Sequence, residues 1–413
     1  MSITDGFDLI DPRPYGKHGP PHATWTALRR SSPVHRCHPP GYAPFWAVTR
    51  HADICEISKH PETFLNAPGI VVVPEDRPID RSEGVGAMRT IIEMDPPDHR
   101  KFRKVASPWF TPRALGRIDA AVQKSARALV DDLAAGSGEG QCDFAVDIAA
   151  AHPLRILSTI LGVPREEEPR ILRLTNQLFA ADDAELQREG PDRAQAMREL
   201  GMELYQLFSK IIEDRRANPR DDLASVLANG RVDGALMGPL ETFGYFLITF
   251  TAGHDTTKNA IAGGMRALAE NPDELEKLRR APELVPAAVE EIVRWATPVN
   301  YMKRTAARDV ELRGEKIREG DDLVLFYASA NRDEDVFDDP FRFCVDRHPN
   351  PHLGFGIGEH FCLGAHLARR SQRALFSELV RRLESVELAG EPEWIRSSFV
   401  VGLKHLPVRY RIA

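Results

Sequence analysis

The spacing of apolar residues predicts a chain built mainly from helices. Apolar side chains recur every three or four positions, with charged residues between them, over residues 112–135 and 194–216. The stretch 239–270 is longer and, in its first half, apolar on nearly every side. Such a pattern predicts a helix that runs through the interior of the protein.

Local signals mark where further helices begin and end. Asn271, Pro272 and Glu274 stand in the order of an N-cap, a first-turn proline and a third-position glutamate, so a helix should begin there. A helix over 284–295 should end before Pro298, because the residue before a proline disfavours helical geometry.

Short apolar runs between proline and glycine turns predict strands near both ends of the sequence. Strands are expected at 33–37, 45–49, 310–312 and 323–327. The first forty residues read as coil with one short helix at 23–30. The expected fold class is mainly α with small β-sheets (α+β). We find no repeat and no dividing linker, so 1–413 is expected to be a single domain.

Composition narrows the possible functions. The 413 residues are 42% hydrophobic and 28% charged, with a formal charge of -7, which argues against a nucleic-acid binder. The longest apolar stretch is too short for a membrane span, and the first residues do not form a signal peptide. The five cysteines are scattered and form no CxxC pair, so a reducing cytoplasm is the expected location.

The segment Phe355–Gly364 (FGIGEHFCLG) places Cys362 on a glycine-rich turn before a predicted helix. Gly356 and Gly358 allow a tight bend. At a helix N-terminus, free N–H groups and the helix dipole favour a thiolate, so we expect a lowered pKa for Cys362. A thiolate is a suitable ligand for iron. A buried core cysteine is the alternative interpretation.

A second unusual segment, residues 252–257 (AGHDTT), lies inside the apolar helix. Glycine costs about 1 kcal/mol relative to alanine in a helix interior, and a buried carboxylate is costly unless it is paired. Threonine hydroxyls can bond a carbonyl one turn back and bend a helix. We therefore expect a weakened helix and a polar groove, in which Asp255 and Thr256 relay protons. A simple buried kink is the alternative.

Two pairs of residues carry weaker signals. Glu291 and Arg294 are three positions apart and can form an ion pair, which is worth little at a surface. His99 and Arg103 share a helix face and suit a ligand with a carboxylate. Taken alone, both pairs are also compatible with a solvated charged face.

Together these segments resemble the cytochrome P450 family. Residues 355–364 resemble its heme-binding loop, residues 252–256 its oxygen-activation motif, residues 291–294 its E-x-x-R helix and residues 99–103 its first heme-propionate helix. The segments occur in the family's order. The resemblance implies the cytochrome P450 fold, with heme held between a long central helix and a cysteine-bearing loop.

The resemblance also implies residue roles. Cys362 would be the axial thiolate ligand of the heme iron, and the catalytic residues Asp255 and Thr256 would deliver protons during oxygen activation. The heme would be held by His99, Arg103, Arg304 and His360 at its propionates and bordered by Phe355, Gly356, Gly364 and Ala252. Glu291, Arg294 and Arg342 would form the buried network that fixes the heme loop. The family more often has arginine at the position of His360, although histidine also donates.

The implied activity is that of a monooxygenase that inserts one oxygen atom from O2 into a C–H bond, with heme b as cofactor. The chain has no room for a flavin domain, so electrons would come from a separate iron–sulfur ferredoxin and its reductase. The basic run 100–104 could steer an acidic ferredoxin.

The substrate is implied less sharply. By resemblance, the pocket would be lined by Val72, Ile248, Ala252, Val299, Asn300, Met302, Phe399 and Val400. Mostly apolar walls favour a small hydrophobic molecule of the terpenoid, branched-lipid or sterol-like class. The main alternative is a hydroxylase or demethylase of a small aromatic acid, whose carboxylate Arg77, Arg81 or Arg89 could bind.

Other classes are a peroxygenase, a non-catalytic heme sensor or carrier, and a scaffold derived from the family. The intact pair Asp255–Thr256 argues against each of them.

Overall fold

The computed structural model describes residues 3–76, 88–135, 138–179, 182–188 and 193–413. The α-helices are α1 (Phe7–Ile10), α2 (Pro12–His18), α3 (His22–Ser31), α4 (His51–Ser58), α5 (Asp98–Ala106), α6 (Asp119–Ala134), α7 (Ala151–Leu161), α8 (Glu168–Phe179), α9 (Arg193–Ala217), α10 (Leu223–Ala228), α11 (Pro239–Glu270), α12 (Pro272–Arg280), α13 (Val285–Ala296), α14 (Tyr327–Ala330) and α15 (Ala365–Arg382). Shorter helical turns are η2 (Ala114–Ile118), η3 (Ala145–Ala150, a π-helix), η4 (Arg165–Glu167), η5 (Pro282–Leu284) and η6 (Gly358–His360).

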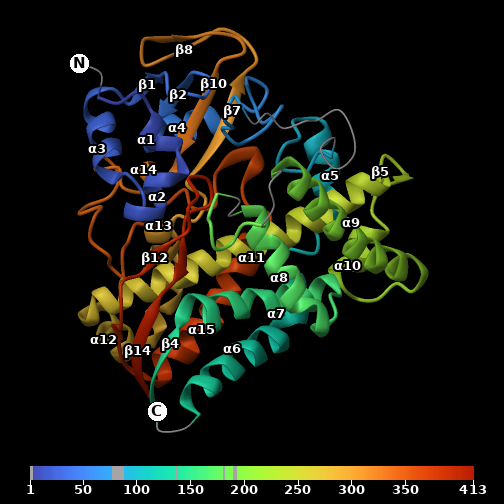
Figure 1. Ribbon diagram of the computed structural model, residues 1–413, viewed down its shortest axis with the longest axis vertical. Coiled ribbons are helices and arrows are strands. Elements are labelled where there is room, and N and C mark those ends of the chain that lie inside the picture. The colour runs from blue at the N-terminus through green and yellow to red at the C-terminus, as the bar shows by residue number, and fades with distance from the viewer. Residues whose placement is uncertain (1–2, 77–87, 136–137, 180–181, 189–192) are drawn as a thin grey trace.

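The strands are short and lie mostly outside the helical body (Figure 1). They are β1 (Val34–Cys37), β2 (Phe45–Val48), β3 (Phe64–Leu65), β4 (Glu139–Asp143), β5 (Arg231–Val232), β6 (Ala235–Leu236), β7 (Tyr301–Ala306), β8 (Val310–Leu312), β9 (Glu315–Ile317), β10 (Asp322–Phe326), β11 (Leu383–Leu388), β12 (Glu393–Trp394), β13 (Leu403–His405) and β14 (Pro407–Ile412). The fold is therefore mainly α with small sheets, as the sequence predicts.

Helix α11 crosses the middle of the molecule and packs against η3, α7, α9 and α13 (Figure 1). It begins at Pro239 in the first helical position, where the missing N–H costs nothing. Phe243, Phe246 and Phe250 are completely buried on it, which explains the apolar first half of its sequence. In the part of the chain that the structure describes, no helix has the length and apolar character needed to cross a membrane.

The largest sheet has the strand order β1-β2-β10-β7-β3, and only β2 and β10 run parallel. Alternate residues of β10 enter two different cores, with Leu323 and Leu325 on one face and Val324 and Phe326 on the other. Strand β7 follows the same alternation. Met302 and Arg304 line the central cavity, whereas Tyr301 packs on the opposite face.

Sequence and structure differ most at the two ends of the chain. The first forty residues contain α1 and α2 in addition to the expected helix, so the coil prediction was wrong there. The Asp11 side chain caps α2 by accepting a hydrogen bond from Arg13 N. The sheet of β11, β14 and β4 was not predicted, because it joins segments that are far apart in the sequence.

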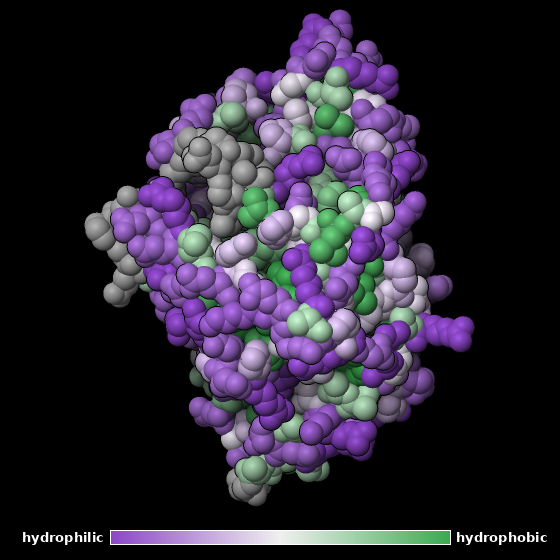
Figure 2. Space-filling view, turned by 90° about the vertical axis from the view of Figure 1, so that its right-hand side faces the viewer, coloured by the Kyte–Doolittle hydropathy of each residue, from purple (hydrophilic) through white to green (hydrophobic). Residues whose placement is uncertain are grey.

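The helix 239–270 is continuous in the structure, although a local weakening was expected around residues 252–257. The hydroxyl of Thr256 donates to Ala252 O at 2.6 Å, and the hydroxyl of Thr251 donates to Leu247 O at 2.7 Å. These bonds add to the backbone pattern without interrupting the helix. The side of the molecule that carries α5, α9 and α10 is mainly hydrophilic, with apolar residues near its middle (Figure 2).

Candidate active site

A cavity of about 240 Å³ lies between α11 and the segment that leads into α15. Ile248, Ala252 and Thr256 line it from α11, one helical turn apart, and Cys362 lines it from the cysteine-bearing loop. Gly253 lets α7 come close, because a Cβ on it would lie 3.0 Å from Leu157 Cδ2. The cavity thus joins the two segments that the sequence marks as unusual.

The loop before α15 holds Cys362 through its backbone. Cys362 N donates to Phe355 O at 2.9 Å, and Ala365 N donates to Cys362 O at 3.3 Å. Gly358 has a φ of +76°, and a Cβ on it would lie 2.3 Å from Ser58 O at the end of α4. Only glycine fits this close approach, so α4 fixes the path of the loop.

The ionisation of Cys362 differs from the sequence-based expectation. Burial raises the pKa of its thiol, and the Gly364 N–H together with the positive charges of Arg103 and Arg369 opposes this only in part. Cys362 stands three residues before the first residue of α15, so the helix dipole acts on it weakly. The protein chain alone therefore does not produce the lowered pKa that we expected.

Four cationic or donor side chains gather at one side of the cavity: His99, Arg103, Arg304 and His360. The rings of His99 and His360 are 4.1 Å apart between centroids. The Nε2 atom of His360 is buried and has no hydrogen-bond partner in the part of the chain that the structure describes. Burial lowers the pKa of His360 to about 2, and the nearby His99, Arg304 and Arg103 contribute to the lowering. This arrangement calls for an anionic ligand.

The hydrogen bonds that these side chains make within the protein do not use all of their N–H groups. His99 Nδ1 lies 3.0 Å from Glu359 Oε1, Arg103 Nη2 donates to Phe361 O at 2.6 Å, and Arg304 Nη1 donates to Lys303 O at 2.9 Å. An arginine has five N–H donors. Each guanidinium therefore keeps further N–H groups with which it can bind an anion.

Asp255 and Thr256 sit differently on α11. Thr256 lines the cavity, whereas Asp255 is 4% exposed and does not belong to the cavity wall. Asp255 Oδ1 lies 3.5 Å from His254 Nδ1, and Asp255 Oδ2 has no hydrogen-bond partner among the described residues. The Asp255 carboxyl is therefore held behind the cavity wall, although its residue adjoins Thr256 in the sequence.

Glu291 and Arg294 form a completely buried pair, with two N–O distances of 2.7 Å. Arg294 also donates to the carbonyls of Asn331, Pro340 and Arg342, so the pair ties α13 to the chain that leads to the cysteine loop.

The third member of this network is Arg347, whose Nε lies 3.2 Å from Glu291. The assignment of Arg342 was wrong in this respect, because Arg342 takes part through its backbone oxygen.

The expected substrate pocket is reproduced in part. Ile248, Ala252, Val299 and Met302 line the cavity, whereas Val72, Asn300, Phe399 and Val400 do not. Asn300 is fully buried, and its amide donates to Tyr15 Oη at 3.0 Å and Ser398 O at 2.8 Å. Arg77 and Arg81 lie outside the described residues. Arg89 lies 3.5 Å from Asp98.

Sequence reasoning missed several cavity residues. Ile91, Ile92, Leu157 and Thr249 all line the cavity. Thr249 carried a usable signal, because it stands three and seven positions before Ala252 and Thr256 and so shares their helix face. The others come from segments without any local pattern that would single them out, and only the tertiary fold brings them to the cavity.

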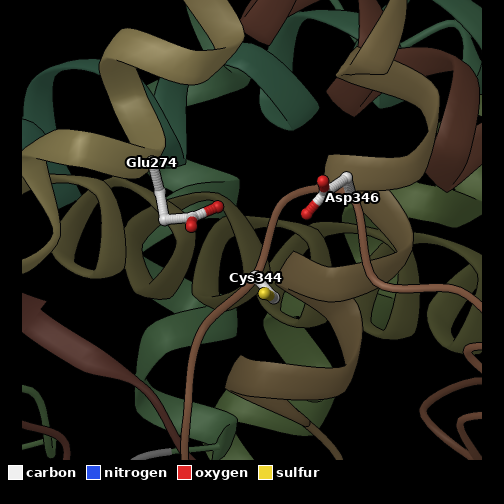
Figure 3. A group of neighbouring side chains, drawn as sticks. All are labelled: Glu274, Cys344 and Asp346. Atoms are coloured by element: carbon white, nitrogen blue, oxygen red, sulfur yellow. The ribbon is translucent and has the colours of Figure 1, made fainter.

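A separate cluster combines Glu274, Cys344 and Asp346 away from the cavity (Figure 3). One ligand atom from each lies within 4.8 Å of the others. Lys277 Nζ, however, lies 2.7 Å from Asp346 and 3.5 Å from Glu274. Its ammonium already pairs with both carboxylates, so we assign no metal to this cluster.

The fold and the cavity define a protein that holds an anionic cofactor between a long helix and a cysteine-bearing loop. The family model described as cytochrome P450 matches residues 42–410. The chain therefore belongs to the cytochrome P450 family, and it is an oxidoreductase that uses heme b and incorporates oxygen from O2.

Similar proteins agree with this family. The chain is 38% identical to cytochrome P450-terp of a Pseudomonas species over 97% of this chain and 96% of that protein. It is 39% identical to the methyl-branched lipid omega-hydroxylase of Mycobacterium bovis over 94% and 90%. The crystal structure of CYP108D1 from Novosphingobium aromaticivorans has a TM-score of 0.90 and 39% identity, over 99% of this chain and 98% of that one.

The residues of the cavity fit heme b. Heme b carries two carboxylates, which match the cationic side with the unpartnered Nε2 of His360. Its iron accepts a thiolate, which Cys362 can supply from the cavity wall. Phe355, Gly356 and Gly364 also line the cavity. The chain therefore supplies both the side chains that can bind the heme carboxylates and the sulfur that can bind the iron.

Proposed function

We propose that the protein is a heme-thiolate monooxygenase that hydroxylates a small hydrophobic molecule, with Cys362 as the axial ligand. The observation that carries this proposal is one cavity whose wall includes both Cys362 and Thr256. The bound heme supplies the activation of O2 and the oxidation of the C–H bond. We further propose that residues 1–413 form one domain, which is supported by the match over residues 42–410.

In this proposal the chain performs three tasks. His99, Arg103, Arg304 and His360 hold the two carboxylates of the cofactor. Apolar side chains of the cavity wall position the substrate and keep bulk water away. Thr256 presents its hydroxyl at the cavity, and Asp255 supplies that hydroxyl with protons from behind the wall.

The proposed substrate class is a terpenoid, branched lipid or sterol-like molecule. Ile91, Ile248, Val299 and Met302 give the cavity apolar walls that suit such a compound. The relative named methyl-branched lipid omega-hydroxylase supports the branched-lipid part of the proposal. A small aromatic acid is less favoured, because Arg89 already lies beside Asp98 and the cations of the cavity suit the cofactor.

The proposed electron donor is a separate iron–sulfur ferredoxin with its reductase. The surface near the cysteine loop carries several basic residues. His366, Arg370 and Arg373 line one hollow with Pro112, which precedes Arg113, and Lys104 follows Arg103, which donates to Phe361 O. Arg100 pairs with Glu359 at 2.9 Å, and Lys101 pairs with Asp233 at 2.6 Å. These two cations are already engaged, so Lys104 and Arg113, both exposed, are better placed to attract an acidic partner.

A cytoplasmic location is part of the proposal and is supported by the state of the cysteines. All five belong to the described residues, and each is a free thiol. Free thiols are typical of a reducing compartment.

A panel of terpenoids, branched fatty acids, sterols and aromatic acids tests the substrate proposal. Each compound is added to the heme-loaded protein, and the low- to high-spin shift of the heme absorption is recorded. Shifts confined to the first three groups would support the proposal, and the shifting compounds are then tested for hydroxylated product. A shift given only by aromatic acids would favour the alternative. A spin shift without any oxidised product, in the presence of NADH, ferredoxin and reductase, would favour a sensor or carrier.

A further inference from the structure

Lys258 is a buried cation on the central helix that the proposed function does not use. It is 4% exposed, and it has no hydrogen bond or ion pair within 4.0 Å among the described residues. Lysine is almost never fully buried unless it is paired. Burial lowers its pKa, and the carboxylates of Asp255, Asp143 and Glu185 oppose this. A buried ammonium without a close partner destabilises the fold, and a functional role would explain why it is present.

Lys258 shares one face of α11 with two further polar side chains. Asp255, Lys258 and Asn259 stand at positions i, i+3 and i+4. Among the described residues, Asp255 Oδ2, both amide atoms of Asn259 and Nδ1 of the neighbouring His254 are buried without a hydrogen-bond partner. Such atoms are the partners that a bridging buried water requires. The face behind the cavity wall is therefore polar and suited to hydration.

This face leads directly to a charged cluster at the surface. A Cβ on Gly402 would lie 2.1 Å from Asn259 Cγ, so the start of β13 lies against α11 at this point. Three residues further on, His405 Nδ1 lies 2.5 Å from Asp143 Oδ2 and its Nε2 lies 2.8 Å from Glu185 Oε1. Glu185 is about half exposed, and His405 is one-third exposed.

The charged and titratable groups around this route come from every element that packs there. They are His254 and Asp255 on α11, Asp143 and Asp147 at β4 and η3, Asp183 and Glu185 after α8, Glu393 on β12, and Lys404 and His405 on β13. Burial lowers the pKa of His405, but its hydrogen bonds with Asp143 and Glu185 outweigh this and raise it overall. The two carboxylates therefore favour the imidazolium form of His405 at the outer end of the route.

We infer that Lys258 passes protons from the Asp143–Glu185–His405 surface cluster to Asp255, and so feeds the proposed role of Asp255 on which this inference rests. The ammonium of Lys258 gives one proton to the Asp255 carboxylate through water, which leaves a neutral amine and a carboxylic acid. The imidazolium of His405 then returns a proton to the amine, and His405 takes one from solvent. No electron moves, and each cycle carries one proton inward.

The deciding variant is Lys258→Arg, because arginine keeps the charge but cannot be deprotonated in a protein. Lys258→Met, His405→Gln and Asp255→Asn are made in parallel, with Lys316→Arg on the exposed strand β9 as the matched control. Product and peroxide per NADH are measured from pH 6 to 9 on the heme-loaded protein with a surrogate ferredoxin. The substrate is a compound that gave a spin shift and product.

A proton relay predicts that Lys258→Arg and Lys258→Met both lose product about a hundredfold and release more peroxide, at the lower end of the 10²–10⁴-fold that positioned proton donors contribute. His405→Gln should give a smaller loss, and this loss should shrink as the pH rises, because His405 of the parent protein then also loses its proton. Lys316→Arg should behave as the parent protein. If Lys258 acts only through its charge or its packing, Lys258→Arg should give as much product per NADH as the parent protein. That result would overturn the inference.

A readout independent of activity is the thermal unfolding temperature of the heme-loaded protein against pH. The pKa of Lys258 is lower in the folded than in the unfolded chain, so between these two values the unfolded chain binds more protons. Lys258→Met should therefore unfold at a higher temperature than the parent protein at pH 7, and the difference should shrink as the pH rises. A difference that stays constant with pH would show that Lys258 does not titrate in the fold.

These variants distinguish a failure of the proton route through Lys258 from a failure of the proposed role of Asp255. If Asp255→Asn uncouples the reaction while Lys258→Arg, Lys258→Met and His405→Gln keep the parent coupling and pH profile, the route is wrong and the role of Asp255 stands. If Asp255→Asn leaves coupling unchanged, the proposed function of Asp255 is wrong, and the route falls with it.

Discussion

Asp255 and Thr256 are neighbours in the sequence but face different surroundings on α11. Thr256 lines the cavity and donates its hydroxyl to Ala252 O at 2.6 Å, whereas Asp255 is buried behind the wall beside His254. Adjacent helical residues point about 100° apart, so one short segment reaches both the cavity and the polar region behind it. If Asp255 supplies protons as proposed, this division lets them reach Thr256 from behind the cavity wall.

The first prediction concerns the hydroxyl at the cavity wall. Thr256→Ala should lower product per NADH and raise peroxide release while NADH consumption persists, because the group that hands on protons is gone. Thr251→Ala is the matched control. Its hydroxyl makes the same bond one turn back, to Leu247 O, but Thr251 does not line the cavity. Equal coupling in Thr256→Ala and the parent protein would contradict the relay.

The second prediction concerns the iron ligand. Cys362→Ser should abolish the heme-thiolate spectrum, since a serine oxygen replaces the sulfur that the loop presents to the cavity. The measurement is the carbon-monoxide difference spectrum of the reduced protein. Cys344→Ser removes another free thiol, one outside the cavity, and should leave that spectrum unchanged. A red-shifted Soret band retained in Cys362→Ser would disprove the assignment.

Local sequence signals were sufficient for the central helix. The bounds expected from the apolar pattern, 239–270, are those observed for α11, because Pro239 and the pair Asn271–Pro272 mark its two ends. The sheet of β4, β11 and β14 carried no comparable signal. Its register pairs Cys142 with Val408, residues that only the tertiary fold brings together.

Local sequence patterns also could not show which of two neighbouring residues faces the cavity. Val299 lines the cavity, but the adjacent Asn300 points elsewhere, as expected for neighbouring residues in extended chain. A motif of consecutive residues could not tell which of them faces the cavity. Arg342 and Arg347 are both on irregular backbone, and only the path of that backbone decides which guanidinium reaches Glu291.

The third prediction concerns the buried pair on α13. Glu291→Ala should destabilise the protein by about 3–5 kcal/mol, because it leaves the guanidinium of Arg294 buried without its charge partner. Glu276→Ala breaks exposed pairs with Arg279 and Arg280 and should cost about 1 kcal/mol or less. Urea unfolding of both variants, followed by far-UV circular dichroism, checks the difference. Similar losses in the two variants would contradict a special role for the buried pair.

The fourth prediction concerns acid stability. Burial raises the pKa of Glu290, but hydrogen bonds from His352 and Arg369 outweigh this and lower it to about 2. The unfolded chain, with a pKa near 4.5, therefore takes up the proton first. The stability that Glu290 contributes is present above pH 4.5 and is lost as the pH falls towards 2.

Acid unfolding of Glu290→Gln tests this contribution. The variant lacks the ionised partner of Arg369 at every pH, so it should be less stable than the parent protein at pH 7 and should lose less further stability between pH 4.5 and 2. Glu276→Gln, at an exposed position, is the control. Parallel pH curves for Glu290→Gln and the parent protein would show that Glu290 does not keep its lowered pKa in solution.

The fifth prediction concerns electron delivery. Arg100 already pairs with Glu359, and Lys101 already pairs with Asp233. Reversing either charge would therefore break a pair within the protein as well as change its surface charge. Lys104 and Arg113 are exposed, and no ion pair engages them among the described residues. Lys104→Glu and Arg113→Glu should therefore slow the first electron transfer from an acidic ferredoxin, and should flatten its dependence on salt, because they remove long-range attraction.

Stopped-flow reduction of the heme-loaded protein at several salt concentrations measures the electron-transfer effect. Lys316→Glu, which makes the same charge change on β9, is the control and should leave the rate near that of the parent protein. If Lys104→Glu and Arg113→Glu reduce as fast as the control, the basic face near the cysteine loop does not guide the donor. If only Arg100→Glu and Lys101→Glu slow the reaction, the partner competes with Glu359 and Asp233 for these cations, and the docking surface lies on the exposed side of α5.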